Sequence, residues 1–399
     1  MNVGRFALRS FVLVIAAACA SASFSACAAT AGGEAEEEPG TVTLPDGGEG
    51  LDDADTRDGC AEADACPPAL DCAQADFCPT AFPVSRLVAL NAIWGSGADD
   101  VWAVGTRGTV LHNDGTTFVP VDTGSATDIY VAVWGTSSGD VWILGPSFPL
   151  HSNGRLADGG AAVFEPREGS SWVPAKATTG RLWAGSSVGS HVWLAGESSG
   201  RFGATSSFWT LGTDADGAPI WQPELACSDA KPCAAAVRGL WAAGENTAWA
   251  VGHDGQAFVW DAAGTSDAGP AFWTAQSSNT RDDLEAVWGS GPDDVWAVGR
   301  RGTIRHTSRG ASTWSVVQSP TTSDLHAVWG SGPNDVWAAG DSGTILHYDG
   351  AVWSLASLAL PNGDTPTNLF GIWGSGPDDV WIVGEGLILH RSPTNRRRP

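Results

Sequence analysis

The stretch Ala286–Gly299 reads AVWGSGPDDVWAVG, and it decides the fold because the chain repeats it. Two later stretches, Ala327–Gly340 and Gly371–Gly384, closely match it, and each is followed by a short apolar run that ends in histidine. The pattern also begins at Ala92 and Ala132, and degenerate copies surround the pairs Trp183/Trp193 and Trp241/Trp249. Seven copies of a unit of roughly 45 residues predict a repeat architecture.

The tryptophans follow the same period. We assign one tryptophan of each repeat to the end of its first strand: Trp94, Trp134, Trp183, Trp241, Trp288, Trp329 and Trp373. A second tryptophan falls within the second strand of each repeat: Trp102, Trp142, Trp193, Trp249, Trp296, Trp337 and Trp381. Five more, with Phe118 as a sixth aromatic residue, fall where a fourth strand belongs: Trp172, Trp209, Trp273, Trp314 and Trp353.

One repeat has the chemistry of a small antiparallel sheet. Leu284–Trp288 is a short β run, and the Gly-Ser-Gly-Pro-Asp that follows supplies turn residues. Val295–Val298 is apolar on both faces, as a strand covered on both sides must be. Thr303–His306 forms a third strand, and in the next repeat Asp349-Gly350 predicts a hairpin into a fourth. The sequence therefore predicts an all-β, seven-bladed β-propeller of four-stranded antiparallel blades.

Closure of the ring requires a strand from outside the seventh repeat. That repeat ends at Ile388–His390 with no fourth strand before the polar tail. The segment Ala81–Val84 precedes the first repeat and has no blade of its own. We expect it to supply the outer strand of the seventh blade, so that deletion of residues 79–86 lowers the melting temperature sharply.

Repeats of the form WGSGPDDVWAVG, followed by GTILHYDG and a tryptophan, resemble those of a group of bacterial envelope proteins with propeller repeats. The resemblance covers about residues 87–391. More distantly, the repeats resemble Asp-box (bacterial neuraminidase-repeat) propellers and tectonin-type lectin propellers. The Asp-box match is loose, because Thr307–Trp314 keeps the Ser, Gly, Thr and Trp but not the Asp. These relatives imply a fold, while their activities range from sugar binding to assembly and hydrolysis.

The charge balance excludes two classes of partner. The 399 residues include 45 acidic and 21 basic residues, for a formal charge of −24. Binding of nucleic acid needs a basic face, and electrostatic docking on anionic lipid needs one too. No stretch after the N-terminus is long and apolar enough to predict a transmembrane span.

The N-terminus predicts export. Arg5 and Arg9 precede the apolar run Phe11–Ala18, which is too short to span a bilayer. The sequence around Cys27 resembles a lipoprotein box, as does that around Cys19, while Ala20–Ala22 offers an ordinary cleavage site. We therefore expect an extracytoplasmic protein, either secreted or anchored by lipid on Cys27. The predicted segments are an export signal (1–27), an acidic disordered tether (28–59), a Cys-rich segment (60–78), the propeller (79–391) and a basic polar tail (392–399).

Six cysteines lie outside the signal, and in an exported chain an even number predicts disulfides. Cys227 and Cys233 enclose Ser-Asp-Ala-Lys-Pro, a plausible closed loop. The other four, Cys60, Cys66, Cys72 and Cys78, allow three pairings that the sequence leaves open. A zinc cluster is disfavoured, because every neighbouring pair is separated by five residues and no histidine is near.

Histidine and aspartate recur once per repeat at fixed positions. The histidines are His112, His151, His306, His347 and His390, and the aspartates are Asp100, Asp140, Asp294, Asp335 and Asp379. Equivalent positions on different blades lie too far apart to share a metal ion, so we predict a structural role for the histidines. We interpret the aspartates as residues that cap turns. The sequence predicts no metal site and no cofactor.

The variable loops of a repetitive scaffold are where recognition usually resides. The loops between the second and third strands and those between blades share one face of a propeller, and they carry irregular residues in this chain. We expect the long insertion 210–236, with Trp221, to join that face. The predicted binding residues are Arg107, Glu197, Arg201, Trp221, His253, Asp254, Arg300, Arg301, Asp341 and Glu385.

The function predicted from these features is a non-catalytic extracytoplasmic binding or scaffold module that recognises a polysaccharide or an envelope protein. The alternative is a secreted carbohydrate-active hydrolase of sialidase-like architecture. Such an enzyme needs a tyrosine nucleophile, and the chain contains Tyr130 and Tyr348. Tyr348 occupies a hairpin position that Asn113, Ser152 and Thr307 fill in other repeats, which argues against a catalytic role.

Overall fold

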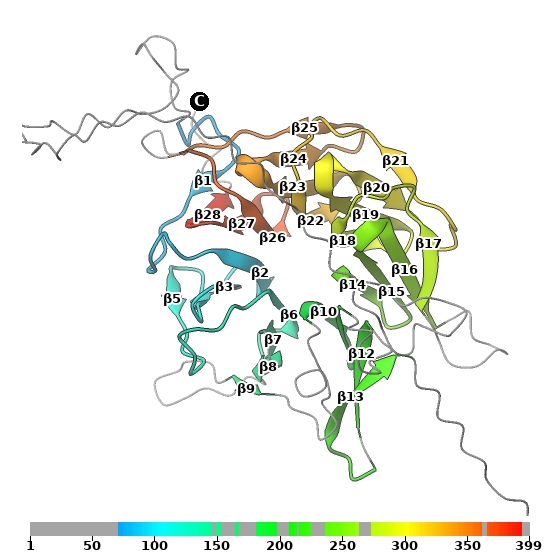
Figure 1. Ribbon diagram of the computed structural model, residues 1–399. Coiled ribbons are helices and arrows are strands. Elements are labelled where there is room, and N and C mark those ends of the chain that lie inside the picture. Colours follow the sequence, from blue (N-terminus) through cyan, green and yellow to red (C-terminus); the bar gives the residue numbers. More distant parts are fainter. Residues whose placement is uncertain are drawn as a thin grey trace, which may run out of the picture. The chain divides into compact units, whose positions relative to one another are not determined.

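The computed structural model describes residues 71–145, 149–152, 164–166, 181–197, 207–213, 215–224, 236–262, 273–360 and 365–392. Within them the chain forms seven four-stranded antiparallel sheets, which confirms the predicted seven-bladed propeller (Figure 1). Cys66–Pro399 is one compact unit that contains all seven blades. No described helix is both long enough and apolar enough to cross a membrane.

Blades 1 to 3 take the strands in chain order from the channel outward. Blade 1 consists of β2 (Leu90–Gly97), β3 (Asp100–Gly105), β4 (Val110–Asn113) and β5 (Phe118–Pro120). Blade 2 consists of β6 (Ala132–Ser137), β7 (Asp140–Leu144), β8 (Pro149–Ser152) and β9 (Glu165–Pro166). Blade 3 consists of β10 (Leu182–Val188), β11 (His191–Gly196), β12 (Phe208–Thr213) and β13 (Pro219–Glu224).

Blades 4 to 6 follow the same order. Blade 4 consists of β14 (Val237–Gly244), β15 (Thr247–Gly252), β16 (Gln256–Asp261) and β17 (Trp273–Ser277). Blade 5 consists of β18 (Leu284–Gly291), β19 (Asp294–Gly299), β20 (Ile304–Thr307) and β21 (Ser315–Val317). Blade 6 consists of β22 (Leu325–Gly332), β23 (Asp335–Gly340), β24 (Ile345–Tyr348) and β25 (Trp353–Leu355).

Blade 7 combines the two ends of the described chain. Its inner strands are β26 (Leu369–Gly376), β27 (Asp379–Gly384) and β28 (Leu387–Arg391), and its outer strand is β1 (Cys78–Pro79). In blades 4, 5 and 6 a short 3-10 turn links the second and third strands: η1 (His253–Gly255), η2 (Arg300–Gly302) and η3 (Asp341–Gly343). Figure 1 shows the inner strands of the blades arranged around a common centre.

Indole rings pack each inner strand onto the next blade. Trp288 in blade 5 covers Gly330 in blade 6, where an added Cβ would lie 2.6 Å from an indole carbon. The same relation joins Trp241 to Gly289 and closes the ring at Trp373 and Gly95. Glycine is required at these positions because the tryptophan of the preceding blade occupies the space of a side chain.

The inner strand of blade 3 does not pack a tryptophan onto the next blade in this way, and the assignment of Trp183 to the end of its first strand was wrong. Trp193 pairs with Ser186, so a serine holds the position that tryptophan holds in blade 4, where Trp249 pairs with Trp241. The Ser186 hydroxyl accepts a hydrogen bond from the backbone N–H of Ala242 in blade 4, at 3.0 Å. Trp183 lies three residues earlier, at the β-bulge between Leu182 and Ala184. It therefore starts the inner strand instead of packing between blades.

Aromatic residues on the outer strands pack edge-on against the second-strand tryptophan of the preceding blade. Phe118 contacts Trp381 in this way, and Trp353 contacts Trp296, with interplanar angles of 87° and 74°. In blade 3 we expected Trp209 on the fourth strand, and this was wrong: Trp209 lies on the third strand, β12, and Trp221 lies on the fourth, β13. In blade 2, Phe164 holds this position against Trp102, and the expected Trp172 lies outside the described residues.

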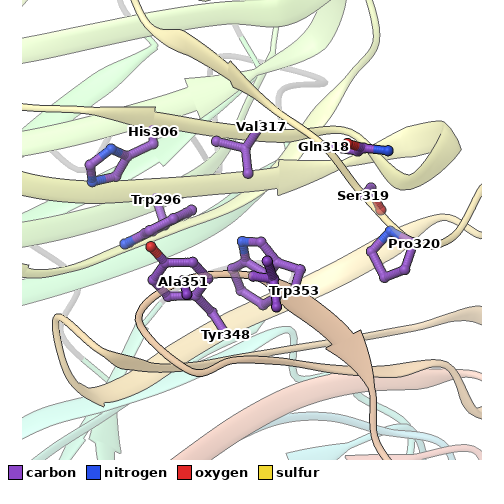
Figure 2. Close-up of a pocket in the computed structure, with 10 residues that line it drawn as sticks. Trp296, His306, Val317, Gln318, Ser319, Pro320, Tyr348, Ala351 and Trp353 are labelled. Atoms are coloured by element: carbon purple, nitrogen blue, oxygen red, sulfur yellow. The ribbon is translucent and has the colours of Figure 1, made fainter.

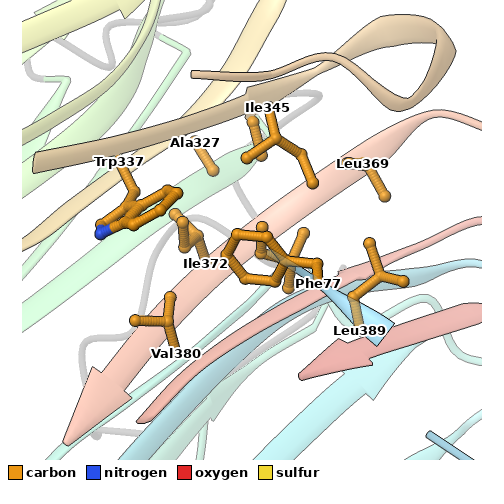
Figure 3. Close-up of a cluster of buried hydrophobic side chains, with 10 residues drawn as sticks. Phe77, Ala327, Trp337, Ile345, Leu369, Ile372, Val380 and Leu389 are labelled. Atoms are coloured by element: carbon orange, nitrogen blue, oxygen red, sulfur yellow. The ribbon is translucent and has the colours of Figure 1, made fainter. Parts of the chain in front are cut away.

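The ring closes as predicted, but with a different segment. Cys78 and Pro79 pair with His390 and Leu389 in β28, so residues 81–84 are not the closing strand. Phe77, immediately before β1, is fully buried and meets Trp337 of blade 6 at 82° (Figure 3). Phe77 thus supplies the outer aromatic residue that the seventh repeat lacks, and it bridges to Leu358 of blade 6.

Polar contacts hold the same closing segment. Arg391, 4% exposed, places its Nη1 3.0 Å from Oδ1 of Asp76 and its guanidinium 4.7 Å from the centre of the Trp337 ring. The backbone N–H and hydroxyl of Ser357 donate hydrogen bonds to the Asp76 carboxylate. A Cys72–Cys78 disulfide, with Cα atoms 5.5 Å apart, settles one of the open pairings. Cys60, Cys66, Cys227 and Cys233 lie outside the described residues, as do residues 1–59 and 393–399.

Candidate functional site at the channel mouth

A repeated β-bulge aims one side chain of almost every blade at the central channel. In β2 the register shifts between Leu90 and Ala92, and the extra residue is Asn91. The same shift occurs at the start of the inner strand in blades 3 to 7. Val131 occupies the matching position just before β6. A bulge breaks the regular alternation of side chains along a strand, and here the side chain of the extra residue points into the channel.

These bulge residues together line one cavity of 340 Å³, which we call the channel mouth. Its lining, one residue from each blade with Ile129 added, is Asn91, Ile129, Val131, Trp183, Arg238, Glu285, His326 and Phe370. Six blades keep the inner-strand tryptophan and five keep the glycine after it, yet the seven bulge residues are all different. The scaffold is therefore symmetric while the mouth is chemically asymmetric.

A second layer of polar residues positions the mouth residues. The indole N–H of Trp183 donates to Glu197 at 3.2 Å, and the imidazole of His326 bonds to Asp341 at 2.7 Å. Arg300 lies 3.5 Å from Glu285 and 3.2 Å from Asp283. Each second-layer partner except Asp283 is the first residue after a second strand, so the loop between strands two and three braces its own blade's bulge residue.

The positive charge of Arg238 is not paired with a described carboxylate. Its Nη2 lies 3.1 Å from Nε2 of His253, and His253 Nδ1 lies 3.5 Å from Asp283. The Arg238 Nε is buried and has no hydrogen-bond partner among the described residues, and no described carboxylate forms an ion pair with this guanidinium. The guanidinium lies over the Trp183 ring, 4.1 Å from its centre. It is therefore held in place by an aromatic face and retains unused donors.

The structure brings together about half of the binding residues expected from the sequence. Glu197, Arg300 and Asp341 belong to the second layer described above, and His253 contacts Arg238. Glu385 lies near the amide of Asn368 in blade 7. The sequence did not predict that the bulge residues themselves line the site. A signal existed, since each follows the first buried residue of its inner strand, but the bulge that turns it inward is a tertiary feature.

Other expected binding residues lie elsewhere. Arg107, Asp254 and Arg301 are exposed turn residues with left-handed backbone, at φ values of 59°, 53° and 55°. Trp221 differs from expectation: it lies in β13, is 2% exposed and packs against Trp142 of blade 2, so it does not reach the loop face. Arg201 lies outside the described residues.

The recurrent aspartates and histidines pair within each blade. In all five copies the histidine Nε2 lies 2.6–2.7 Å from the aspartate Oδ1. The second-strand tryptophan stacks on the histidine in four of them, as Trp381 does on His390 at 3.6 Å. The predicted turn capping therefore involves only one carboxylate oxygen, which accepts a hydrogen bond from a turn hydroxyl such as that of Ser96. The other oxygen pairs with the histidine. No cluster of three or more metal-ligating side chains occurs in the described parts of the chain.

This pairing shifts the acidity of the carboxyl groups. Burial by itself would raise the pKa of Asp100, but hydrogen bonds from His112, Ser96 and Trp102 outweigh it and leave the pKa below its ordinary value. The same balance lowers the pKa of Asp140, Asp335 and Asp379. These aspartates are charged structural acceptors at neutral pH.

The two tyrosines occupy different surroundings. Tyr130 is 1% exposed and its hydroxyl lies 2.7 Å from that of Thr123, and burial raises the pKa of Tyr130. Tyr348 lies at the outer end of the seam between blades 5 and 6, near Trp296 and Trp353.

Comparison with known proteins supports the propeller fold but does not assign the chain to a family. No family model matches the chain, and no curated protein matches it. Among solved structures, "YCF48 bound to D1 peptide" has a TM-score of 0.56 at 19% identity, covering 82% of this chain and 99% of that one. The WD40 propeller domain of Doa1 has a TM-score of 0.58 at 10% identity, covering 81% and 100%. The extracellular domain of the hybrid two-component protein BT3049 of B. thetaiotaomicron has a TM-score of 0.58 at 13% identity, covering 80% of this chain and 41% of that one.

Proposed function

We propose that this chain is a non-catalytic binding module that engages a polypeptide segment of an envelope protein at the channel mouth. The carrying observation is that seven blades built on one repeat present seven different side chains at one equivalent position, around one cavity. A position that only had to hold the ring together would not need this diversity.

The chemistry of the mouth suits a polypeptide. Trp and Arg often dominate the energetics of protein interfaces and Phe is enriched in them, and Trp183, Arg238 and Phe370 all line the cavity. The unused donors of Arg238 can meet backbone carbonyls or a carboxylate, while Glu285 offers an acceptor for a partner's N–H. A cavity of 340 Å³ accommodates a few side chains, so the segment enters the mouth instead of threading through it. One solved protein of similar fold is bound to a peptide, which supports peptide binding by this architecture.

Selection of peptides from a displayed random library against the intact protein tests the proposal. We expect enriched peptides whose affinity falls at least about tenfold in Arg238→Gln and in Phe370→Ala, which corresponds to losing one well-made contact. Val316→Ser, on the exposed outer rim, serves as the matched control and should bind normally. Failure to enrich any peptide, or binding that ignores both mouth substitutions, would contradict the proposal.

We place this module outside the cytoplasm, either secreted or anchored by lipid on Cys27. The export pattern of residues 1–27 supports this location, and so does the Cys72–Cys78 disulfide, because such bonds persist in oxidising compartments. Mass spectrometry of the mature N-terminus separates the two forms. A diacylglyceryl-modified Cys27 indicates the anchor, an unmodified N-terminus beyond Cys27 indicates secretion, and an intact Met1 contradicts export.

A further inference from the structure

A second cavity opens on the outer rim, at the seam between blades 5 and 6. It measures 460 Å³ and lies among the outer strands, whereas the channel mouth lies among the inner ones. Figure 2 shows the rings of Trp296, Tyr348 and Trp353 gathered in it, below the strand that carries Val317. Four of the ten lining residues are aromatic, and the walls come from both blades.

The neighbouring seam between blades 4 and 5 is closed by the side chain of Gln276 and by a backbone bridge. Gln276 accepts a hydrogen bond from the Trp314 indole N–H at 2.8 Å and donates one to the Ala311 carbonyl at 2.8 Å. Beside it, Ser277 and Thr313 form a parallel bridge between the two outer strands. A matching bridge, Phe77 with Leu358, closes the seam between blades 6 and 7.

The seam between blades 5 and 6 lacks both devices. Val317 occupies the register position of Gln276, since Val317 pairs with Ile304 as Gln276 pairs with Ala257. Valine offers no acceptor, and the indole N–H of Trp353, in a side chain 7% exposed, is left without a partner. No bridge joins the described outer strands of these two blades at Gln318 and Val352. The cavity is thus the unsealed equivalent of a closed seam.

Tyr348 supplies a further aromatic wall at this seam. The equivalent residue of blade 5 is Thr307, which is buried. The Tyr348 ring lies 4.8 Å from that of Trp296 and 5.5 Å from that of Trp353. Its hydroxyl has no hydrogen-bond partner among the described residues, so it is available to a ligand.

The lining carries no aspartate, glutamate, lysine or arginine. The one titratable imidazole, His306, is tied through Nε2 to Asp294 at 2.7 Å. The cavity thus offers aromatic faces, the hydroxyl of Tyr348, the amide of Gln318 and no formal charge. A purely apolar ligand would leave those donors unsatisfied, and a charged one would find no counter-charge.

We infer that this seam binds a neutral sugar residue of a glycan. A pyranose ring has apolar C–H faces that stack on aromatic rings and equatorial hydroxyls that hydrogen-bond at its edge. The inference is independent of the channel-mouth proposal, because the two cavities share no lining residue.

Saturation-transfer NMR on the intact protein tests this inference, with neutral trisaccharides of glucose, mannose, xylose and N-acetylglucosamine as probes. We expect at least one to bind, with an affinity measured by calorimetry that falls about tenfold or more in Val317→Gln. That variant rebuilds the seal seen with Gln276. The matched control is Val316→Gln on the opposite, exposed face of the same strand, which should bind as wild type does.

Two further variants, Tyr348→Thr and Arg238→Gln, complete the test. Tyr348→Thr restores the residue of blade 5 and should also weaken binding, which covers the case in which Val317→Gln fails to fold. Arg238→Gln at the channel mouth should leave sugar binding unchanged. Absence of binding for every trisaccharide, full binding in Tyr348→Thr, or loss in Arg238→Gln with retention in Val317→Gln would overturn the inference.

Discussion

The guanidinium of Arg238 lies 4.1 Å above the ring of Trp183, so that side chains of two neighbouring blades meet at the channel mouth. Both residues lie at the bulge of their inner strand, and Ser186 holds the position at which other blades pack tryptophan between sheets. Trp183 is thereby released from a structural role that nearly every other inner-strand tryptophan performs. Its place in the sequence suggests packing, while its place in the structure suggests recognition.

Substitution of Trp183 should therefore cost little stability. Trp134, 6% exposed, packs on Gly185 of blade 3, so Trp134→Ala should lower the free energy of unfolding by about 3–5 kcal/mol. Trp183→Ala loses a cation–π contact and the hydrogen bond to Glu197, and should cost about 1 kcal/mol. Chemical denaturation followed by circular dichroism measures both. Equal losses would show that Trp183 also packs between blades.

Two glycines of β22 provide a matched test of the packing between blades. An added Cβ at Gly330 would meet the Trp288 ring at 2.6 Å and the Asp335 carbonyl oxygen at 2.6 Å, whereas one at Gly332 would meet nothing within 4 Å. Gly330→Ala should destabilise the propeller by about 1–3 kcal/mol, as overpacking does. Gly332→Ala should change stability by less than about 0.5 kcal/mol. Similar denaturation midpoints for the two variants would refute this account.

Closure of the ring should depend on Phe77. This side chain is fully buried between blades 6 and 7, so Phe77→Ala should cost about 3–5 kcal/mol and lower the melting temperature. Leu87, 79% exposed, lies between the closing strand and blade 1, and Leu87→Ala should melt as wild type does. Calorimetry distinguishes the two. A Phe77→Ala protein with unchanged melting would show that the ring closes without this contact.

The Asp76–Arg391 pair should make closure sensitive to acid. Burial would raise the pKa of Asp76, but hydrogen bonds from Ser357 and the charge of Arg391 outweigh it and lower the pKa. A carboxyl whose pKa is lower in the folded state stabilises that state above its ordinary pKa and ceases to do so as pH falls through the folded value. Asp76→Asn should therefore be less stable than wild type at pH 7, and the difference should shrink below about pH 4.

Unfolding free energies measured between pH 7 and pH 3 check this dependence. Asp293→Asn is the control, because that side chain is 69% exposed and makes a single distant contact with Arg309, at 3.9 Å. Its stability should follow wild type throughout the range. A difference between wild type and Asp76→Asn that stays constant down to pH 3 would contradict the role given to the pair.

The architecture was readable from the sequence because it rests on local and periodic chemistry. Turn residues, strands apolar on both faces and a tryptophan period are properties of each repeat, and a single blade cannot bury both of its faces without neighbours. That argument gave the fold class, the number of blades and the need for a closing strand. The structural role of the recurrent histidines was inferred from the same period.

What the sequence did not determine are the features that depend on register between distant segments. Cys78–Pro79, with Phe77 buried beside it, closes the ring instead of Ala81–Val84, because burial between blades 6 and 7 selects the residue that fills the gap. Trp183 lies three residues before the packing position, which Ser186 holds, and the spacing of tryptophans does not reveal that register. The bulge residues meet at the channel mouth, and Val317 leaves a seam open, because closing the ring brings together side chains that are far apart along the chain.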